Sequence, residues 1–567
     1  MNASTLFSSS IRKRALPAAR IGFGATVLLA LVLGYWGLVW HSHSAGYAFG
    51  KGFWNLAYYD LQLFVLGSAP LDAPGSFPWP LQVARFLAPA ATVYALFEAV
   101  RVVFASEWRR RWQRRSSGHT IVVGETPIAD AVVDGLRRSG QVVLRAAVGD
   151  AAALRDAGIA GARFVYACAD DHLDSSVNVL AAATARRQER GRKAGDLNVY
   201  AHISDPTYAL ALRARHLSQP VTGADFFNVD EIAAREVVRT DTGLFRADAP
   251  LVVVAGLGPF GQSIVVELAR AWQVSASHAA GERLRLLLVD GAAETVAAEL
   301  QRRWPAVSAA CDLIAAADLG TVFAAPDAPV PHRVYLCYQA EDEAVRAALT
   351  MATLWSGGER SVVLRLDRLA GLADVFGPGE GSLLDDVEGR LRPVSVGRLV
   401  VGADANGTYR LHEDIYERLA RLVHHNYLQR EVTNGHPMGS TAAMAPWDEL
   451  SEDLKEANRA HARSIGTKLT EVGCTVAPRR DAGVDLSQDP KFETLAEQEH
   501  IRWMDERIRQ GWTYGEVRDD ATKRHPSLVP WQSLAESEKE KDRAAVRDLA
   551  AVLADCGLQI VRVPDRA

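Results

Sequence analysis

Residues 251–261 read Leu-Val-Val-Val-Ala-Gly-Leu-Gly-Pro-Phe-Gly, and residues 284–290 read Leu-Arg-Leu-Leu-Leu-Val-Asp. An apolar run typical of a buried strand leads into a Gly-x-Gly-x-x-Gly turn, and a second strand-like run ends on an acid. In this context Gly256 permits a tight turn, Gly258 lets backbone N–H groups approach a pyrophosphate, and Gly261 lets the next helix pack on the sheet. The pattern predicts a nucleotide-binding α/β fold with a helix N-terminus directed at the phosphates.

The expected ligand contacts come from this turn and from the end of the second strand. Asp290 stands where a carboxylate accepts hydrogen bonds from a ribose, which favours NAD(H) over a dinucleotide with a 2′-phosphate. Another adenine nucleotide is the alternative. The candidate cofactor-binding residues are Gly256, Gly258, Pro259, Phe260, Gly261 and Asp290.

Strand-like and helix-like runs alternate on both sides of the fingerprint. One copy of the pattern occupies residues 118–246 and the fingerprint copy occupies 250–400, which predicts two tandem Rossmann-like, doubly wound parallel sheets. The turn of the first copy, Gly124-Glu-Thr-Pro-Ile-Ala129, keeps only the first glycine, and no acid ends its second strand. We interpret the first copy as a structural lobe, with a bound nucleotide as the alternative.

The N-terminal part contains two long apolar runs. Residues 21–40 are uncharged and long enough to cross a bilayer, and residues 81–104 are a second candidate. Basic residues before the first run and after the second place both ends in the cytoplasm. We therefore expect a multi-pass protein of a bacterial-type inner membrane, with a cytoplasmic N-terminus (1–20), a transmembrane α-helical hairpin (21–105) and a basic linker (106–117).

The segment between the two runs resembles part of a pore. Residues 53–66 are apolar but too short to cross, which suits a re-entrant or interfacial helix. The loop at 66–72 does not align with the Thr-Val-Gly-Tyr-Gly run whose carbonyl groups select potassium. A non-standard pore and a hairpin that only anchors and oligomerises therefore both stand. The pore candidates are Asp60, Gly67, Ser68 and Glu98, the last placed to pair with Arg101.

Two further blocks carry a family resemblance. Cys168-Ala-Asp-Asp171 precedes a helical run with Asn178, and Phe226-Phe-Asn-Val-Asp230 precedes another. With the fingerprint, these blocks resemble the RCK or Trk-type nucleotide-binding domains over about 118–400. The resemblance implies cytoplasmic lobes that assemble as homodimers or homotetramers, bind NAD(H) or another adenine nucleotide, and control the passage of an inorganic cation, with potassium as the first candidate.

From about residue 411 the alternation gives way to helical periodicity. The blocks Leu495-Ala-Glu-Gln-Glu-His-Ile-Arg-Trp503, Gly511-Trp-Thr-Tyr-Gly515 and His525-Pro-Ser-Leu-Val-Pro-Trp531 resemble the ryanodine-receptor-repeat (RyR) domain across 411–562. The resemblance implies a mainly α-helical module that binds a small ligand or a protein. Aromatic and basic side chains here can stack a base and hold a phosphate. The alternative, that the tryptophans are core residues, is the interpretation we favour. The ligand candidates are Glu499, His500, Arg502, Trp503, Trp512, Tyr514 and Lys523.

Composition narrows the class of protein. The chain has 567 residues, of which 48% are hydrophobic and 23% charged, so it holds several domains and is not wholly embedded in a membrane. A formal net charge of −5 gives no case for nucleic-acid binding. The five cysteines lack paired spacing, which indicates a reducing compartment without disulfide bonds.

Three functions fit these features. The first is a nucleotide-regulated channel or transport protein for an inorganic cation, which would contact the lipid bilayer, a small nucleotide and copies of itself. The second is a non-conducting, membrane-tethered nucleotide sensor or antiviral-type effector. The third is a membrane-bound NAD-dependent oxidoreductase. The sequence offers no acid–base pair beside the fingerprint, so we expect no enzyme. It leaves open whether the two lobes pair within one chain or between chains.

Overall fold

The computed structural model describes residues 9–44, 48–67, 69–72, 76–169, 178, 182, 197–218, 224–241, 243–246, 250–275, 278, 281–323, 330–350, 361–367, 391–400, 415–519 and 521–563. The chain forms two compact units, Met1–Trp112 and Gln113–Ala567. The first unit is the predicted hairpin, and the second holds both α/β lobes and the C-terminal domain.

The hairpin consists of two long helices and a short one. They are α1 (Ser9–His41), α2 (Phe53–Gln62) and α3 (Trp79–Arg115), with 3-10 turns at Leu63–Val65 and Ala69–Leu71. Two stretches, Gly22–His41 and Trp79–Arg101, are long and apolar enough to cross a membrane, by length and composition. Since α3 continues to Arg115, most of the predicted linker is the end of this helix.

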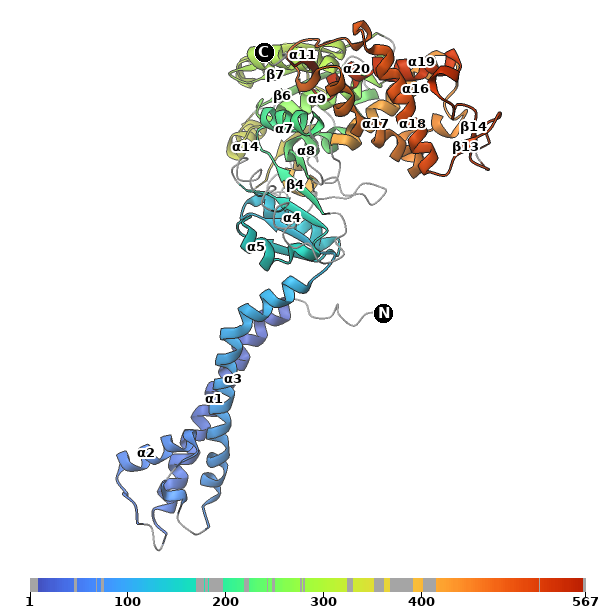
Figure 1. The fold of residues 1–567 in the computed structure, drawn as a ribbon. Coiled ribbons are helices and arrows are strands. Elements are labelled where there is room, and N and C mark those ends of the chain that lie inside the picture. Colours follow the sequence, from blue (N-terminus) through green and yellow to red (C-terminus); the bar gives the residue numbers. More distant parts are fainter. Residues whose placement is uncertain are drawn as a thin grey trace. The chain divides into compact units, whose positions relative to one another are not determined.

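The helices α1, α2 and α3 make up the hairpin (Figure 1), and small residues let them approach closely. A Cβ on Gly37 of α1 would lie 2.5 Å from the backbone nitrogen of Leu81 in α3, and a Cβ on Gly34 would meet the carboxylate of Asp60 in α2. Such contacts between glycine and a neighbouring helix are typical of helix pairs in membranes. The predicted short helix after residue 53 is confirmed as α2.

The first lobe is a five-stranded parallel sheet in the order β2-β1-β3-β4-β5. Its strands are β1 (Thr120–Val123), β2 (Val143–Ala146), β3 (Phe164–Ala167), β4 (Asn198–His202) and β5 (Ala224–Phe227). The helices include α4 (Pro127–Arg138), α5 (Ala151–Asp156), α7 (Pro206–Ser218) and α8 (Val229–Arg239). The predicted helix after Asp171 lies almost wholly outside the described residues.

The second lobe repeats this plan with one additional strand. Its parallel sheet has the order β11-β10-β9-β6-β7-β8. The strands are β6 (Leu251–Ala255), β7 (Leu284–Val289), β8 (Cys311–Ala316), β9 (Arg333–Leu336), β10 (Val362–Arg365) and β11 (Leu391–Val394). The helices include α9 (Pro259–Gln273), α11 (Ala293–Arg303), α12 (Pro305–Ala310), α13 (Leu319–Phe323), α14 (Glu341–Thr350) and α15 (Val396–Val400). The prediction of two tandem parallel sheets is confirmed, whereas the specific edge strands β8 and β11 were not predicted.

The two lobes pair within one chain. Helices α8 and α9 pack against each other, and a single apolar core contains side chains of both lobes. Beside it, the Asp241 carboxylate accepts hydrogen bonds from the Arg333 guanidinium at 2.5 Å and the Tyr335 hydroxyl at 2.9 Å. A buried core and a buried polar contact of this kind make the lobes one structural body.

The C-terminal domain is mainly helical, as predicted. Its helices are α16 (Ile415–Thr433), α17 (Glu452–Glu471), α18 (Phe492–Arg509), α19 (Glu536–Arg547) and α20 (Leu549–Asp555). An unpredicted antiparallel pair, β12 (Cys474–Pro478) with β15 (Leu558–Arg562), joins its two halves, and β13 (Thr513–Tyr514) pairs with β14 (Arg524–His525). Its core also takes in apolar residues of α7 in the first lobe.

Candidate functional site

The turn after β6 has a geometry that requires glycine at two positions. Gly256 has a φ of +83°, and a Cβ there would lie 2.7 Å from the backbone nitrogen of Tyr338. A Cβ on Gly261 would lie 2.1 Å from the carbonyl oxygen of Gly256. Both positions therefore admit no side chain without movement of the backbone, and the expected roles of these two glycines are consistent with the structure.

The N-terminus of α9 is open at the same turn. Gly258 is the cap residue of α9, and no side chain accepts a hydrogen bond from the first N–H groups of the helix as a cap. A Cβ on Gly258 would meet only the Gln339 side chain, at 3.6 Å. Pro259 follows as the first helical residue, where its missing N–H costs nothing. A helix start without a side-chain cap leaves backbone N–H groups and the positive end of the helix dipole for an anion.

The turn lies at the point where the sheet order reverses. Strand β6 is flanked by β9 on one side and by β7 on the other, and all three strands are parallel. In open parallel sheets, ligands bind outside the carboxyl ends of the strands at this reversal. The fingerprint is therefore placed where a doubly wound sheet forms a ligand crevice.

Asp290 follows β7 and faces the turn, as expected. One carboxylate oxygen accepts a hydrogen bond from the Leu257 N–H at 2.9 Å, and the other accepts from the Ala292 N–H at 3.0 Å. A carboxylate has about four lone-pair positions, so two acceptor positions are still left for ribose hydroxyl groups. The residue thus shapes the turn in addition to its expected role toward a ribose.

The Phe260 side chain points away from the turn. It is buried in the core, and the guanidinium carbon of Arg365 lies 5.3 Å from its ring centre. Only the backbone of Phe260 is therefore placed to contact a ligand at the start of α9. The side chain instead fixes the helix on the sheet.

The pore candidates lie in different surroundings. Asp60 is buried beside Gly34, and its Oδ1 has no hydrogen-bond partner within the described residues. Glu98 and Arg101 form an ion pair at 2.5 Å, which confirms the predicted pairing. Gly67 follows Leu66, which is left-handed with a φ of +63°, and Ser68 lies outside the described residues. 3-10 turns at Leu63–Val65 and Ala69–Leu71 lie before and after these two residues.

Four of the seven ligand candidates in the C-terminal domain share one cleft. Glu499, His500, Arg502 and Trp503 line a cavity of about 310 Å³. Trp512 lies beside this cavity, with its ring 6.1 Å from that of His525. The remaining two candidates, Tyr514 and Lys523, do not line it: Tyr514 is exposed, and the Lys523 ammonium donates to the Gln510 carbonyl at 2.8 Å. Neither Trp503 nor Trp512 is fully buried.

Glu499 is the centre of a buried ionic cluster beside the cleft. Its carboxylate accepts hydrogen bonds from Lys468, from His461 at 2.8 Å and from Arg502 at 2.7 Å. Burial raises the pKa of Glu499, but the charges of Arg502, His461 and Lys468 outweigh it and hold the pKa well below its usual value. Glu499 is therefore held in its ionised form by three partners, and because it also lines the cleft, its role as a ligand contact stays a prediction. Among the residues that the structure describes, no three His, Cys, Asp or Glu side chains are grouped to hold a metal ion.

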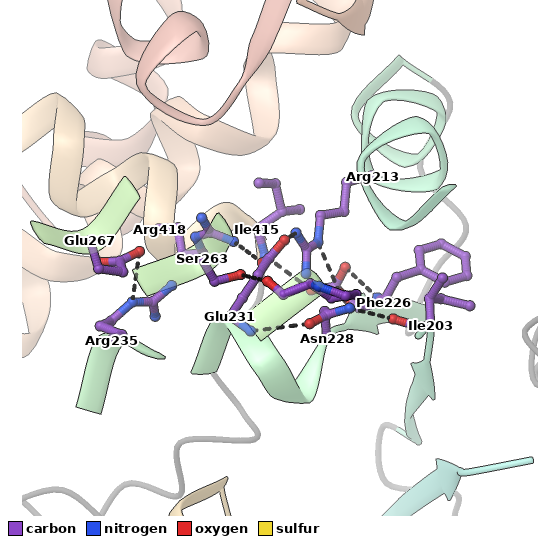
Figure 2. A network of polar contacts seen from close by, with 12 residues as sticks. Ile203, Arg213, Phe226, Asn228, Glu231, Arg235, Ser263, Glu267, Ile415 and Arg418 are labelled. Atoms are coloured by element: carbon purple, nitrogen blue, oxygen red, sulfur yellow. Dashed lines mark hydrogen bonds and ion pairs between the residues drawn. The ribbon is translucent and has the colours of Figure 1, made fainter. Parts of the chain in front are cut away.

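A second polar network joins the first lobe to the C-terminal domain (Figure 2). Glu231, in the first turn of α8, pairs with Arg213 of α7 at 2.8 Å and with Arg418 of α16 at 3.2 Å. Burial raises the pKa of Glu231, yet the two arginine charges hold it at about 2. Asn228 caps the same helix, with Oδ1 accepting from the Glu231 N–H at 3.1 Å. No sequence pattern indicated this network, because its partners are widely separated along the chain.

The fingerprint helix is tied to both neighbours of its lobe. Glu267 of α9 lies 3.9 Å from Arg235 of α8 and 2.6 Å from Arg270, as Figure 2 shows in part. Arg270 in turn donates to the carbonyl of Asp555, at the end of α20 in the C-terminal domain. One helix thus has the candidate ligand turn at its N-terminus and contacts to two other domains along its length.

Comparison with known proteins identifies one domain. Residues 483–562 match the family model of the RyR domain, which confirms the predicted domain over that range. The match begins after α16 and α17, although both helices pack with the matched region.

Among solved structures, the chain is similar to GsuK bound to ADP, with 15% identity over 68% of this chain and 95% of that chain and a TM-score of 0.32. It is also similar to the GsuK channel bound to NAD, with 13% identity over 85% of this chain and 90% of that chain and a TM-score of 0.33.

Proposed function

We propose that this chain is a nucleotide-regulated membrane protein in which the second lobe binds NAD(H) at the turn 256–261. The observation that carries the proposal is the N-terminus of α9, which has no side-chain cap. It lies at a turn in which Gly256 and Gly261 leave no space for a side chain. Backbone N–H groups there suit a pyrophosphate, and Asp290 suits the adenosine ribose. Another adenine nucleotide would use the same groups.

Regulation would follow from the contacts of α9. A ligand that draws the start of α9 toward its phosphates favours one position of this helix over another, and only such a differential contact shifts an equilibrium. Because α9 is tied to α8 through Glu267 and to α20 through Arg270, a shift of α9 would be felt in both neighbouring domains. Only residues 116–119 separate the end of α3 from β1, so the chain itself connects the first lobe to the hairpin.

The output we propose is the passage of an inorganic cation through an oligomer of hairpins, with potassium as the first ion to test. Two helices of sufficient length and apolarity support membrane insertion, and the short α2 between them matches the helical part of a two-helix pore. We propose no catalytic step for this protein. Its location would be a cytoplasmic membrane, with both lobes and the RyR domain on the cytoplasmic side.

A second candidate is a membrane-tethered sensor that does not conduct. The loop after α2 favours it, because a left-handed residue at Leu66 and a 3-10 turn at Ala69–Leu71 do not provide a ladder of aligned carbonyl groups in the described part of the loop. In that case the nucleotide signal would pass to another protein through the C-terminal domain.

Flux from liposomes containing the full chain separates the two candidates. Potassium, sodium and chloride would be compared with and without NAD(H), and Gly258→Asp would serve as the binding-deficient variant. Gly258 has a φ of −65° and open surroundings, so the position can hold a side chain without strain. The added carboxylate would repel a pyrophosphate. Cation flux that depends on NAD(H) and is lost in Gly258→Asp supports a regulated channel. Binding without flux of any ion favours the tethered sensor.

A further inference from the structure

The cleft of the C-terminal domain is formed by five helices and is separate from the fingerprint turn. Side chains from α16, α17, α18, α19 and α20 line its volume of about 310 Å³. Its lining combines aromatic rings with charged groups, among them His500, Trp503, His525, Arg502 and Arg507. Concave sites that hold small molecules usually begin at about 300 Å³, so one small ligand fits.

Arg502 leaves a buried donor without a partner at this cleft. Its Nε and Nη2 donate to Glu499, at 3.1 Å and 2.7 Å, whereas Nη1 is buried and has no hydrogen-bond partner within the described residues. The side chain is 18% exposed. Buried polar groups without partners are rare in native proteins, and an unsatisfied guanidinium N–H lining a cavity indicates a missing acceptor.

The charge around the cleft favours an anion. The Glu499 carboxylate is shared among Lys468, His461 and Arg502, which leaves an excess of positive charge on that wall. His500 is paired in the same cleft: its Nδ1 lies 3.3 Å from the Asp542 carboxylate and its Nε2 lies 2.9 Å from the Val529 carbonyl, so a charge on its ring is balanced by Asp542. The other pairs on the walls, Arg430 with Asp548 and Lys541 with Glu538, are balanced ion pairs.

The cleft also contains a group of aromatic rings around Trp503. The ring of Trp503 stacks on His500 at 5.8 Å with an angle of 22°, and His525 meets it edge-on at 5.0 Å. The guanidinium of Arg507 lies over two indole rings, 5.9 Å from that of Trp503 and 5.1 Å from that of Trp512. Stacked indole, imidazole and guanidinium groups form a surface on which a flat heteroaromatic ring stacks well.

We propose that this cleft is a second ligand site, which binds a small anion carrying a planar ring, of the size of a purine mononucleotide. The ring would lie against Trp503 and the Arg507 side of the cleft, and the phosphate would accept from Arg502. The volume lies at the small end of the range for ligand sites, which suits a mononucleotide better than a dinucleotide. The RyR domain would thus read a different ligand from the one we propose for the second lobe, and the inference does not depend on that proposal.

The test is calorimetric titration of the full chain in detergent, carrying Gly258→Asp so that the fingerprint turn is blocked. The probes are AMP, GMP, adenosine and inorganic phosphate. We expect AMP or GMP to bind at least tenfold more tightly than adenosine or phosphate alone, because ring and anion contribute together. Within this background, Trp503→Leu and Arg507→Gln should each weaken mononucleotide binding at least tenfold.

Arg509→Gln is the matched control, since Arg509 lies on the same helix, has an exposed side chain that pairs with Glu506, and does not line the cleft. Thermal unfolding of each variant shows whether Arg507→Gln, whose side chain lies outside the buried Glu499 cluster, retains the fold. Absence of mononucleotide binding in the Gly258→Asp background would overturn the proposal, even if the wild-type chain binds NAD. So would binding that Trp503→Leu and Arg507→Gln leave unchanged, or binding of phosphate alone with equal affinity.

Discussion

The two α/β lobes begin with the same turn and differ in what holds it. Gly124 in the first lobe and Gly256 in the second both have positive φ angles, +117° and +83°. A Cβ on either would collide with the backbone after the adjacent strand, at Cys168 or at Tyr338. The first glycine therefore reflects strand packing in both lobes, and it does not by itself indicate a ligand.

The difference lies at the start of the following helix. In the first lobe the Thr126 hydroxyl caps α4 by accepting from the Ala129 N–H at 3.0 Å, and it donates to the Cys168 carbonyl at 2.8 Å. Arg145 donates to the Gly124 carbonyl at 3.0 Å and pairs with Asp130 at 2.5 Å. In the second lobe Gly258 offers no such cap. The first turn is satisfied by its own side chains, whereas the second leaves its helix N-terminus for an external anion.

The largest expected effect comes from the third glycine. Gly261 and Ala129 occupy the same position of α9 and α4, three residues after the cap, but a Cβ on Gly261 meets the Gly256 carbonyl at 2.1 Å. We expect Gly261→Ala to destabilise the second lobe by about 3 kcal/mol through overpacking. Thermal unfolding of the full chain in detergent measures it. The matched change in the first lobe, Ala129→Gly, should cost only about 1 kcal/mol. Equal losses for the two variants would contradict the difference between the turns.

A smaller effect concerns the pH dependence of folding stability, to which the carboxyl edges of the two sheets contribute differently. His202 ends β4 in the first lobe, is buried beside Phe227, and burial lowers its pKa from 6.5 to about 4. The corresponding strand of the second lobe, β10, ends on Arg365, which pairs with Asp230 and Asp367.

Between pH 6.5 and 4 the unfolded chain binds a proton at His202 that the folded chain does not, so folding stability falls as the pH falls through this window. We expect the titration of His202 to lower the free energy of unfolding by about 2 kcal/mol between pH 6.5 and 5. Because other groups titrate as well, the measurement is the difference between the thermal stabilities of the wild type and His202→Gln at each pH. A difference that is constant over this range would show that His202 is not buried in its neutral form.

The smallest effect concerns the cap of the first lobe. Thr126→Ala removes the side-chain acceptor at the start of α4 and should cost about 1 kcal/mol of stability. It should leave the affinity of the chain for NAD unchanged, because Arg145 and Asp130 still occupy that turn. A change in NAD affinity in Thr126→Ala would place a nucleotide in the first lobe.

Local patterns in the sequence predicted the elements of the fold, whereas contacts between segments far apart in the chain were not predicted. Strand and helix periods gave both parallel sheets, and the fingerprint spacing gave the turn, because each depends on residues close in sequence. Edge strand β8 was not predicted, because only its first residue is buried and its sequence, Cys-Asp-Leu-Ile-Ala-Ala, has neither a long apolar run nor a regular alternation. The pair β12 and β15 joins segments about 80 residues apart and leaves no local signal.

In the candidate sites, too, features that depend on neighbouring residues were predicted and features that depend on distant contacts were not. The glycines at 256 and 261 were predictable from steric need, but the burial of Phe260 was not, because the side of α9 that faces the sheet depends on the packing of both lobes. In the C-terminal domain, the aromatic and charged residues on α18 were predicted as candidates. Their partners, such as Lys468 and Asp542, come from other helices and were found only in the structure.

The central claim is that the second lobe binds a dinucleotide at the open end of α9. Calorimetric titration of NAD into the full chain in detergent tests it, with Gly258→Asp compared to Gly258→Asn, which adds the same bulk without the charge. We predict that the wild type binds, that Gly258→Asn stays within about tenfold of it, and that Gly258→Asp loses roughly a hundredfold in affinity through repulsion of the pyrophosphate. Unchanged affinity in Gly258→Asp, or no binding of NAD or another adenine nucleotide to the wild type, would contradict the claim.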